Sequence, residues 1–98
     1  MRFDWDNNKS QLLQESRGYS LDEISIVLAG EYVEQIKRDD PEQFIAIGYL
    51  EKTLLSIIYE IRYDKDGEYV WLITYWNSTK REREIHEQYL NGRARTEN

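Results

Sequence analysis

A dense group of charged side chains, residues 79–87, directly follows an aromatic, strand-like segment. Lys80 and Arg81 fall in the first turn of the helix predicted there. The helix macrodipole favours acidic side chains at that position, so two cations raise the positive potential beside the exposed backbone amides. That combination suits a bound anion such as phosphate. A mixed-charge helix surface that only faces solvent is the commoner arrangement, and the sequence leaves both interpretations open.

A third cation, Arg62, interrupts an apolar, strand-like segment. By strand alternation it shares a face with Ile58 and Glu60. If that face is turned to solvent, Arg62 and Glu60 are ordinary surface residues. If it faces the start of the C-terminal helix instead, Arg62 joins Lys80 and Arg81 in one cationic cluster.

Two aromatic residues, Tyr75 and Trp76, end the last predicted strand beside the charged helix. Aromatic rings in such a place can stack on a nucleic-acid base, although packing within the sheet is the commoner role. His86 is the only histidine of the chain. We interpret it as a surface residue in preference to a catalyst.

The composition is that of one ordinary globular domain spanning residues 1–98, with 40% hydrophobic and 33% charged residues. The absence of cysteine excludes disulfides and thiolate ligands, and a single histidine excludes a two-histidine metal site. We therefore expect neither a metal nor a cofactor. No signal-peptide pattern opens the chain and no apolar run reaches membrane-spanning length. We expect a cytoplasmic protein without a membrane partner.

The formal net charge of −6 disfavours a nucleic-acid binder, because such proteins usually carry a basic surface. The charge is unevenly distributed along the chain. Acidic residues concentrate in the middle, and the C-terminal third is slightly basic. A local basic surface on an acidic domain therefore stays open.

The first two helices are predicted from their caps. Asp6 caps a helix through about residue 16, and Gly18 ends it in a left-handed conformation. Ser20 and Glu23 form the capping box of a second helix, which ends at Gly30.

A C-terminal helix starts at another capping box, between Thr79 and Glu82. We expect Ile85 and Tyr89 to anchor this helix to the sheet. It should end near Gly92, with a frayed tail beyond.

The remaining segments alternate as strands do, which gives the order β-α-α-β-β-β-β-α. Consecutive strands joined by short turns form an antiparallel meander. We expect a small antiparallel sheet, covered on one face by the two N-terminal helices and the C-terminal helix. The predicted fold class is α+β, in two layers.

Five segments together resemble the BrnT toxin family in order and spacing, over about residues 3–87. They are "FDWDNNK", "GYSLDEI", "EQFIAIGYL", "IIYEIR" and "STKRERE". Each motif is weak alone, and their combination is fairly specific. The resemblance implies a RelE-like fold and a single BrnT-like domain.

It also implies a function: the ribonuclease toxin of a type II toxin–antitoxin pair, which cuts RNA without a metal and inhibits translation. Its expected partners are RNA, presented on the ribosome or free, and a small DNA-binding antitoxin that covers the toxin's site. The matching positions assign phosphate contacts to Arg62, Lys80 and Arg81. Proton transfer would fall to Glu82 or His86.

Four positions depart from the family pattern. The family usually has His where this chain has Arg17, Arg at Gln43 and at Trp76, and Tyr at His86. These departures favour an alternative, a catalytically degenerate protein-binding module without nuclease activity. A third interpretation, an unrelated small α+β adaptor, applies if the fold is not RelE-like.

Overall fold

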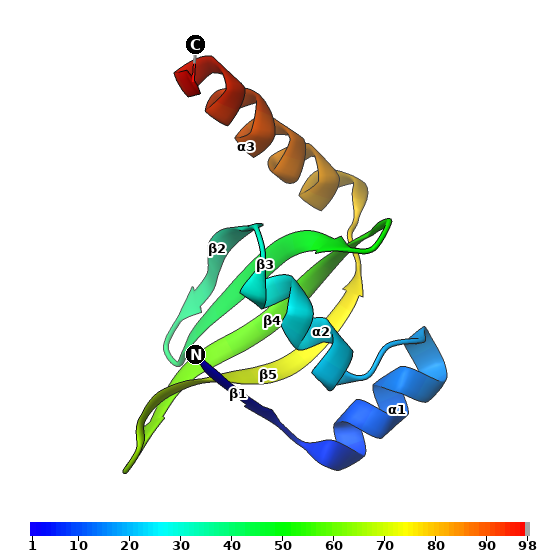
Figure 1. Cartoon of the computed structure of the whole chain (residues 1–98), viewed down its shortest axis with the longest axis vertical. Helices are drawn as coiled ribbons and strands as arrows, with labels where there is room; N and C mark the ends of the chain where they lie inside the picture. Colours follow the sequence, from blue (N-terminus) through cyan, green and yellow to red (C-terminus); the bar gives the residue numbers. More distant parts are fainter. Residues whose placement is uncertain (98) are drawn as a thin grey trace.

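The computed structural model describes the backbone of residues 1–97 and the side chains of residues 1–92. Eight elements follow one another in the predicted order (Figure 1). They are β1 (Arg2–Trp5), α1 (Asn7–Arg17), α2 (Leu21–Ala29), β2 (Tyr32–Asp39), β3 (Glu42–Leu50), β4 (Thr53–Asp64), β5 (Gly67–Asn77) and α3 (Lys80–Glu97). Among the described residues, no helix is long and apolar enough to cross a membrane.

The five strands form one sheet in the order β1-β5-β4-β3-β2. The predicted antiparallel meander is confirmed for β2 to β5. The expectation of a wholly antiparallel sheet was wrong, because β1 lies parallel to β5, with Arg2 opposite Tyr69 and Trp5 opposite Leu72. Short turns dictate antiparallel pairing only between consecutive strands. No short turn joins β1 to β5, so the sequence did not predict the direction of β1.

The helices lie on both faces of the sheet, which corrects the prediction of a single covered face. Helices α1 and α2 pack Leu13, Ile24 and their apolar neighbours onto one face. On the other face, Ile85 of α3 packs against the cluster of Val33, Ile47 and Leu54. Strands β3 and β4 carry apolar residues on both faces, so each face needs a cover. The α+β class holds, with a mixed sheet between helices.

Gly48 allows α2 to approach β3 closely. A Cβ at this position would lie 2.8 Å from Cγ1 of Val27 and 3.0 Å from Cβ of Tyr32. Any side chain there would therefore push α2 away from the sheet.

The predicted caps of α1 and α2 are confirmed. Asp6 accepts a hydrogen bond from the Lys9 amide, and Gly18 ends α1 with φ of 101°. Ser20 and Glu23 form the capping box of α2. The left-handed φ at Gly18 is a conformation that glycine adopts without steric cost.

The predicted end of the last helix near Gly92 was wrong, because α3 continues to Glu97. A glycine inside a helix costs only about 1 kcal/mol relative to alanine, so it need not end one. The frayed tail was expected from about residue 92. The backbone is helical through residue 97, and residue 98 lies outside the described part.

Candidate functional site

Arg62 does not join the other predicted cations. Its guanidinium donates two hydrogen bonds to Glu60 Oε1, at 3.1 and 2.9 Å, and lies 4.5 Å from the centre of the Trp71 ring. Ser56, which contacts α3, is six residues earlier on β4, or about 20 Å away at ~3.3 Å per residue. The hypothetical cluster of Arg62 with Lys80 and Arg81 is therefore not formed.

Glu82 holds α3 to the sheet. Its Oε1 accepts hydrogen bonds from Ser56 Oγ at 2.9 Å, Trp76 Nε1 at 2.9 Å and the Thr79 amide at 2.8 Å. Burial acts to raise the pKa of Glu82, but these hydrogen bonds outweigh it and lower the pKa below its usual value. The predicted capping box with Thr79 is confirmed. A carboxylate held ionised by three donors is poorly suited to transfer protons.

His86 is buried, with 8% of its surface exposed, so its interpretation as a surface residue was wrong. Its ring meets the ring of Tyr49 edge-on, with the centroids 5.5 Å apart. Burial lowers the pKa of His86. The helix anchors are therefore Glu82, Ile85 and His86, whereas the expected anchor Tyr89 is 42% exposed.

Lys80 and Arg81 lie where the sequence predicted them, exposed in the first turn of α3. They follow the end of β5 closely. A chain spans at most about 3.6 Å per residue, so the Cα of Lys80 lies within about 11 Å of the Cα of Asn77. Lys80 and Arg81 therefore lie close to the end of β5.

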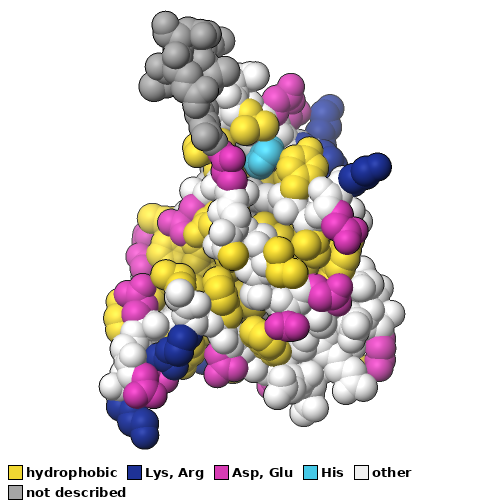
Figure 2. Space-filling model, viewed as in Figure 1, with side chains coloured by type: hydrophobic (Ala, Val, Ile, Leu, Met, Phe, Trp, Pro, Cys, Tyr) yellow, Lys and Arg dark blue, Asp and Glu magenta, His cyan; other side chains and the backbone are white. Residues whose placement is uncertain are grey.

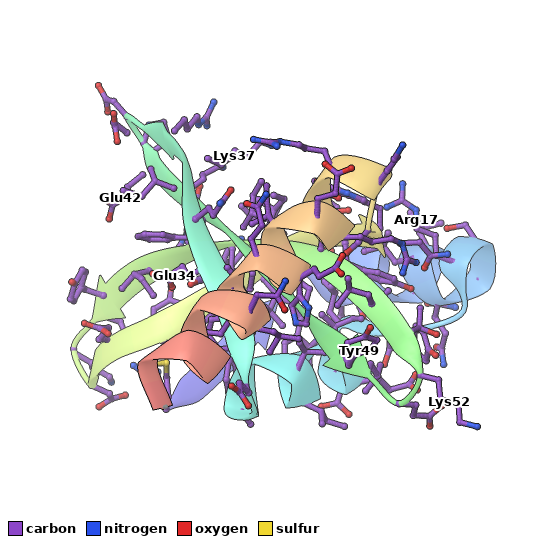
Figure 3. The ribbon with its side chains drawn as sticks, turned by 90° about the horizontal axis from the view of Figure 1, so that it is seen from above. Arg17, Glu34, Lys37, Glu42, Tyr49 and Lys52 are labelled. Carbon is purple, nitrogen blue, oxygen red and sulfur yellow. The ribbon has the colours of Figure 1, made fainter. Side chains whose placement is uncertain are left out.

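An open pocket of 450 Å³ lies at this end of β5, and it is lined by Ser16, Arg17, Trp76 and Asn77. Arg17 and Trp76 are two of the four positions that depart from the BrnT pattern. The structure brings both departures to one surface. In Figure 3, Arg17 lies on the side of the molecule where α3 begins, and Glu42 lies on the opposite side.

The open edge of β5 positions Arg17. Strand β1 pairs with β5 only as far as Leu72, so the edge carbonyls beyond it need other partners. Arg17 Nη1 donates a hydrogen bond to the Tyr75 carbonyl. The Tyr75 hydroxyl in turn donates to the Tyr19 carbonyl at 2.7 Å and accepts from the Tyr19 amide at 2.9 Å. The turn after α1 is therefore tied to β5 on both sides of Gly18.

The roles of Tyr75 and Trp76 differ. The Tyr75 side chain is fully buried and serves packing, because 1% of its surface is exposed. The Trp76 indole is half-buried, and its Nε1 bond to Glu82 fixes it at the pocket wall. Of these two residues, Trp76 is the one whose ring is open to a ligand.

The fourth departure, Gln43, lies away from the pocket. Its Nε2 donates a hydrogen bond of 2.8 Å to Glu60 Oε2. Hydrogen bonds from Gln43 and Arg62 lower the pKa of Glu60. Gln43, Glu60 and Arg62 form a polar group on the same face as α3, beyond the part that the helix covers.

Chemically, the pocket offers a guanidinium, an indole, an amide and a hydroxyl. Such a set can bind a phosphate and stack on a base, but none of the four is a general acid or base near neutral pH. No protein-family model matches the chain, and no curated protein matches its sequence.

Sequence reasoning missed Arg17 as a functional candidate. In the sequence, Arg17 and Trp76 are two of four departures from the BrnT pattern, with nothing to connect them. The sequence did carry one signal relative to the BrnT pattern. It has an additional arginine at a helix end, Arg17, and lacks an arginine at a strand end, Trp76. Only the fold shows that the two positions line the same pocket.

Proposed function

We propose that this protein acts on RNA as the toxin of a BrnT-like toxin–antitoxin pair, with the RNA backbone at the pocket of Arg17. One observation carries the proposal: Arg17 and Trp76 line a single open pocket at the end of β5. Lys80 and Arg81 follow that strand end within a few residues of the chain. Single-stranded RNA with an unstacked base suits such a surface, because the cations can contact its phosphates and the Trp76 ring can stack on the base.

The proposed reaction is metal-independent cleavage of a phosphodiester bond. The 2′-oxygen forms a bond to the adjacent phosphorus while the bond from phosphorus to the 5′-oxygen breaks. The products carry a 2′,3′-cyclic phosphate and a 5′-hydroxyl, and water takes up the 2′ proton and supplies one to the 5′-oxygen. Arg17, with Lys80 and Arg81, stabilises the charge that develops on the phosphorane oxygens.

The geometry limits how much the chain contributes to this reaction. The pocket supplies orientation and charge, whereas Glu82 and His86 are engaged in packing α3. General acid–base catalysis typically contributes about 10²–10⁴-fold, so its absence predicts slow cleavage of free RNA. A net charge of −6 also weakens binding to free RNA. We expect faster cleavage when the ribosome presents the RNA.

A second candidate is the non-catalytic binding module. It is favoured by one specific observation, the use of both predicted proton-transfer residues, Glu82 and His86, as anchors of α3. Under this alternative, the protein keeps the interface with an antitoxin and lacks nuclease activity.

The test is incubation of purified protein with mRNA in EDTA, with and without ribosomes, followed by mapping of the cut ends. The proposal predicts cuts that end in a 2′,3′-cyclic phosphate, with more cutting on ribosomes. A Lys80→Gln, Arg81→Gln double variant should cut at least tenfold more slowly. Absence of cutting by folded protein under both conditions would exclude the nuclease and leave the binding module.

A further inference from the structure

A second surface, lined by other residues than the pocket of Arg17, lies at the base of α3 on the side of Tyr49. Two hollows flank the helix there, with volumes of 260 and 320 Å³, and both are lined by Tyr49, His86 and Leu90. Tyr89 lines the first hollow only. We call this surface the α3 groove. Figure 2 shows hydrophobic side chains on both sides of the single histidine at this place.

The groove exposes large apolar side chains that the domain itself does not cover. Tyr49 is 53% exposed, Tyr89 42% and Leu90 43%. Contiguous exposed apolar side chains rimmed by polar residues mark interaction sites more often than scattered single ones do. Here Tyr49 and Leu90 line both hollows and Tyr89 lines the first, and aromatic residues are enriched at binding hot spots.

Helix α3 extends well beyond the sheet that supports it. At ~1.5 Å per residue it is about 27 Å long. His86 is the last buried residue among its described side chains, and residues 87–92 are all exposed. Figure 1 shows the helix projecting away from the sheet toward its C-terminal end. The groove therefore lies at the base of a projecting helix, where Tyr89 and Leu90 stay exposed beside Tyr49.

The charges around the groove indicate the kind of partner. Glu31 lines one hollow, and Glu87 with Arg83 lines the other, so carboxylates outnumber cations at its rim. The whole chain carries a net charge of −6, which opposes association with a second copy. A basic partner is attracted by both the rim and the whole domain.

We propose that the α3 groove binds an amphipathic helix of a basic partner protein, with apolar side chains seated between Tyr49 and Leu90 and basic side chains beside Glu31 and Glu87. This deepens the proposed function by giving the antitoxin's docking surface, and it rests on that function only for the partner's biological role. No residue lining the groove also lines the pocket of Arg17. The partner therefore need not occupy the RNA pocket.

The test uses a defined probe, a synthetic 16-residue helical peptide with leucines along one face and lysines elsewhere. It is titrated into the isotope-labelled full chain, and amide shifts are followed by NMR. Two control peptides are matched to it: one has the same composition with the leucines scattered around the helix, and the other has Glu in place of Lys. We expect saturable shifts at Tyr49, His86 and Leu90, with at least tenfold weaker binding of both controls.

Two protein variants locate the binding. Leu90→Arg should weaken it at least tenfold. Leu12→Arg makes the same change at a 63% exposed leucine on α1 and should alter it less than twofold. Equal binding of the scattered peptide, or shifts that avoid the groove, would overturn the proposal. So would a concentration-dependent dimer in analytical ultracentrifugation that Leu90→Arg abolishes, because the occupant would then be a second copy.

Failure of the groove and failure of the RNA site are separable. Leu90→Arg should leave RNA cleavage unchanged, and Arg17→Gln should leave peptide binding unchanged. Loss of peptide binding in Arg17→Gln would contradict the assignment of the peptide to the groove.

Discussion

The indole Nε1 of Trp76 donates a hydrogen bond of 2.9 Å to Oε1 of Glu82, which joins the end of β5 to the first turn of α3. The same oxygen accepts from Ser56 on the neighbouring strand β4. One carboxylate thus fixes the wall of the candidate RNA pocket and the start of the helix that carries Lys80 and Arg81. Loosening Glu82 should affect both stability and the site.

Replacement of Glu82 tests this junction. Glu82→Gln keeps the shape but removes the charge that strengthens three hydrogen bonds, so we expect a loss of about 1–2 kcal/mol in the free energy of unfolding. Urea denaturation measures it. Glu84→Gln, at an exposed position on the same helix, is the matched control and should stay within about 0.5 kcal/mol. Equal effects of the two would contradict the junction.

The same junction predicts a dependence on pH. Because the pKa of Glu82 is lowered in the folded state, its contribution is present above the usual glutamate pKa of 4.5 and is lost as the pH falls through the folded value. The difference in stability between the wild type and Glu82→Gln should therefore shrink below pH 4.5. A difference that stays constant down to acid denaturation would show that the charge plays no part.

Burial of His86 predicts a second pH dependence at higher pH. Its pKa is lowered in the folded state, so the folded state resists protonation. Stability should be full above the usual histidine pKa of 6.5 and should fall as the pH drops below it. His86→Phe keeps an aromatic contact with Tyr49 and should remove this decline. An unchanged decline in the variant would assign it to another group.

Close packing at Gly48 predicts opposite effects of alanine at two glycines. Gly48→Ala forces its new methyl group onto Val27 and should cost about 1–3 kcal/mol in urea denaturation. Gly92→Ala lies in open space within α3 and should raise the helical ellipticity, with a gain of up to about 1 kcal/mol in helix propensity. Destabilisation by both to the same extent would contradict the close contact of α2 with β3.

The helices and strands of this fold could be predicted from the sequence because each carries a local signal. Asp6, Gly18 and the capping box of Ser20 with Glu23 act within a few residues of themselves, and all were confirmed. The meander followed for the same reason, since short turns join its strands. The side of the sheet that α3 covers was not readable, because β3 and β4 are apolar on both faces.

The candidate site was less predictable than the fold. Arg62 and Lys80 became candidates because of their charge. Charge alone does not predict how far apart two residues lie in the fold. Arg62 lies six positions along β4 from Ser56, which contacts α3, and Glu60 already pairs with Arg62. Arg17 is a candidate because hydrogen bonds join the turn after α1 to the open edge of β5, and the sequence does not predict that contact.

The proposed function places the RNA backbone at Arg17 and away from Arg62. Single-turnover cleavage of ribosome-bound mRNA by Arg17→Gln and Arg62→Gln, two identical substitutions, tests it most directly, with circular dichroism to show that both variants are folded. We expect a rate at least tenfold lower for Arg17→Gln, or about 1.4 kcal/mol of transition-state stabilisation, and a change under twofold for Arg62→Gln. A loss in Arg62→Gln with full activity in Arg17→Gln would contradict it.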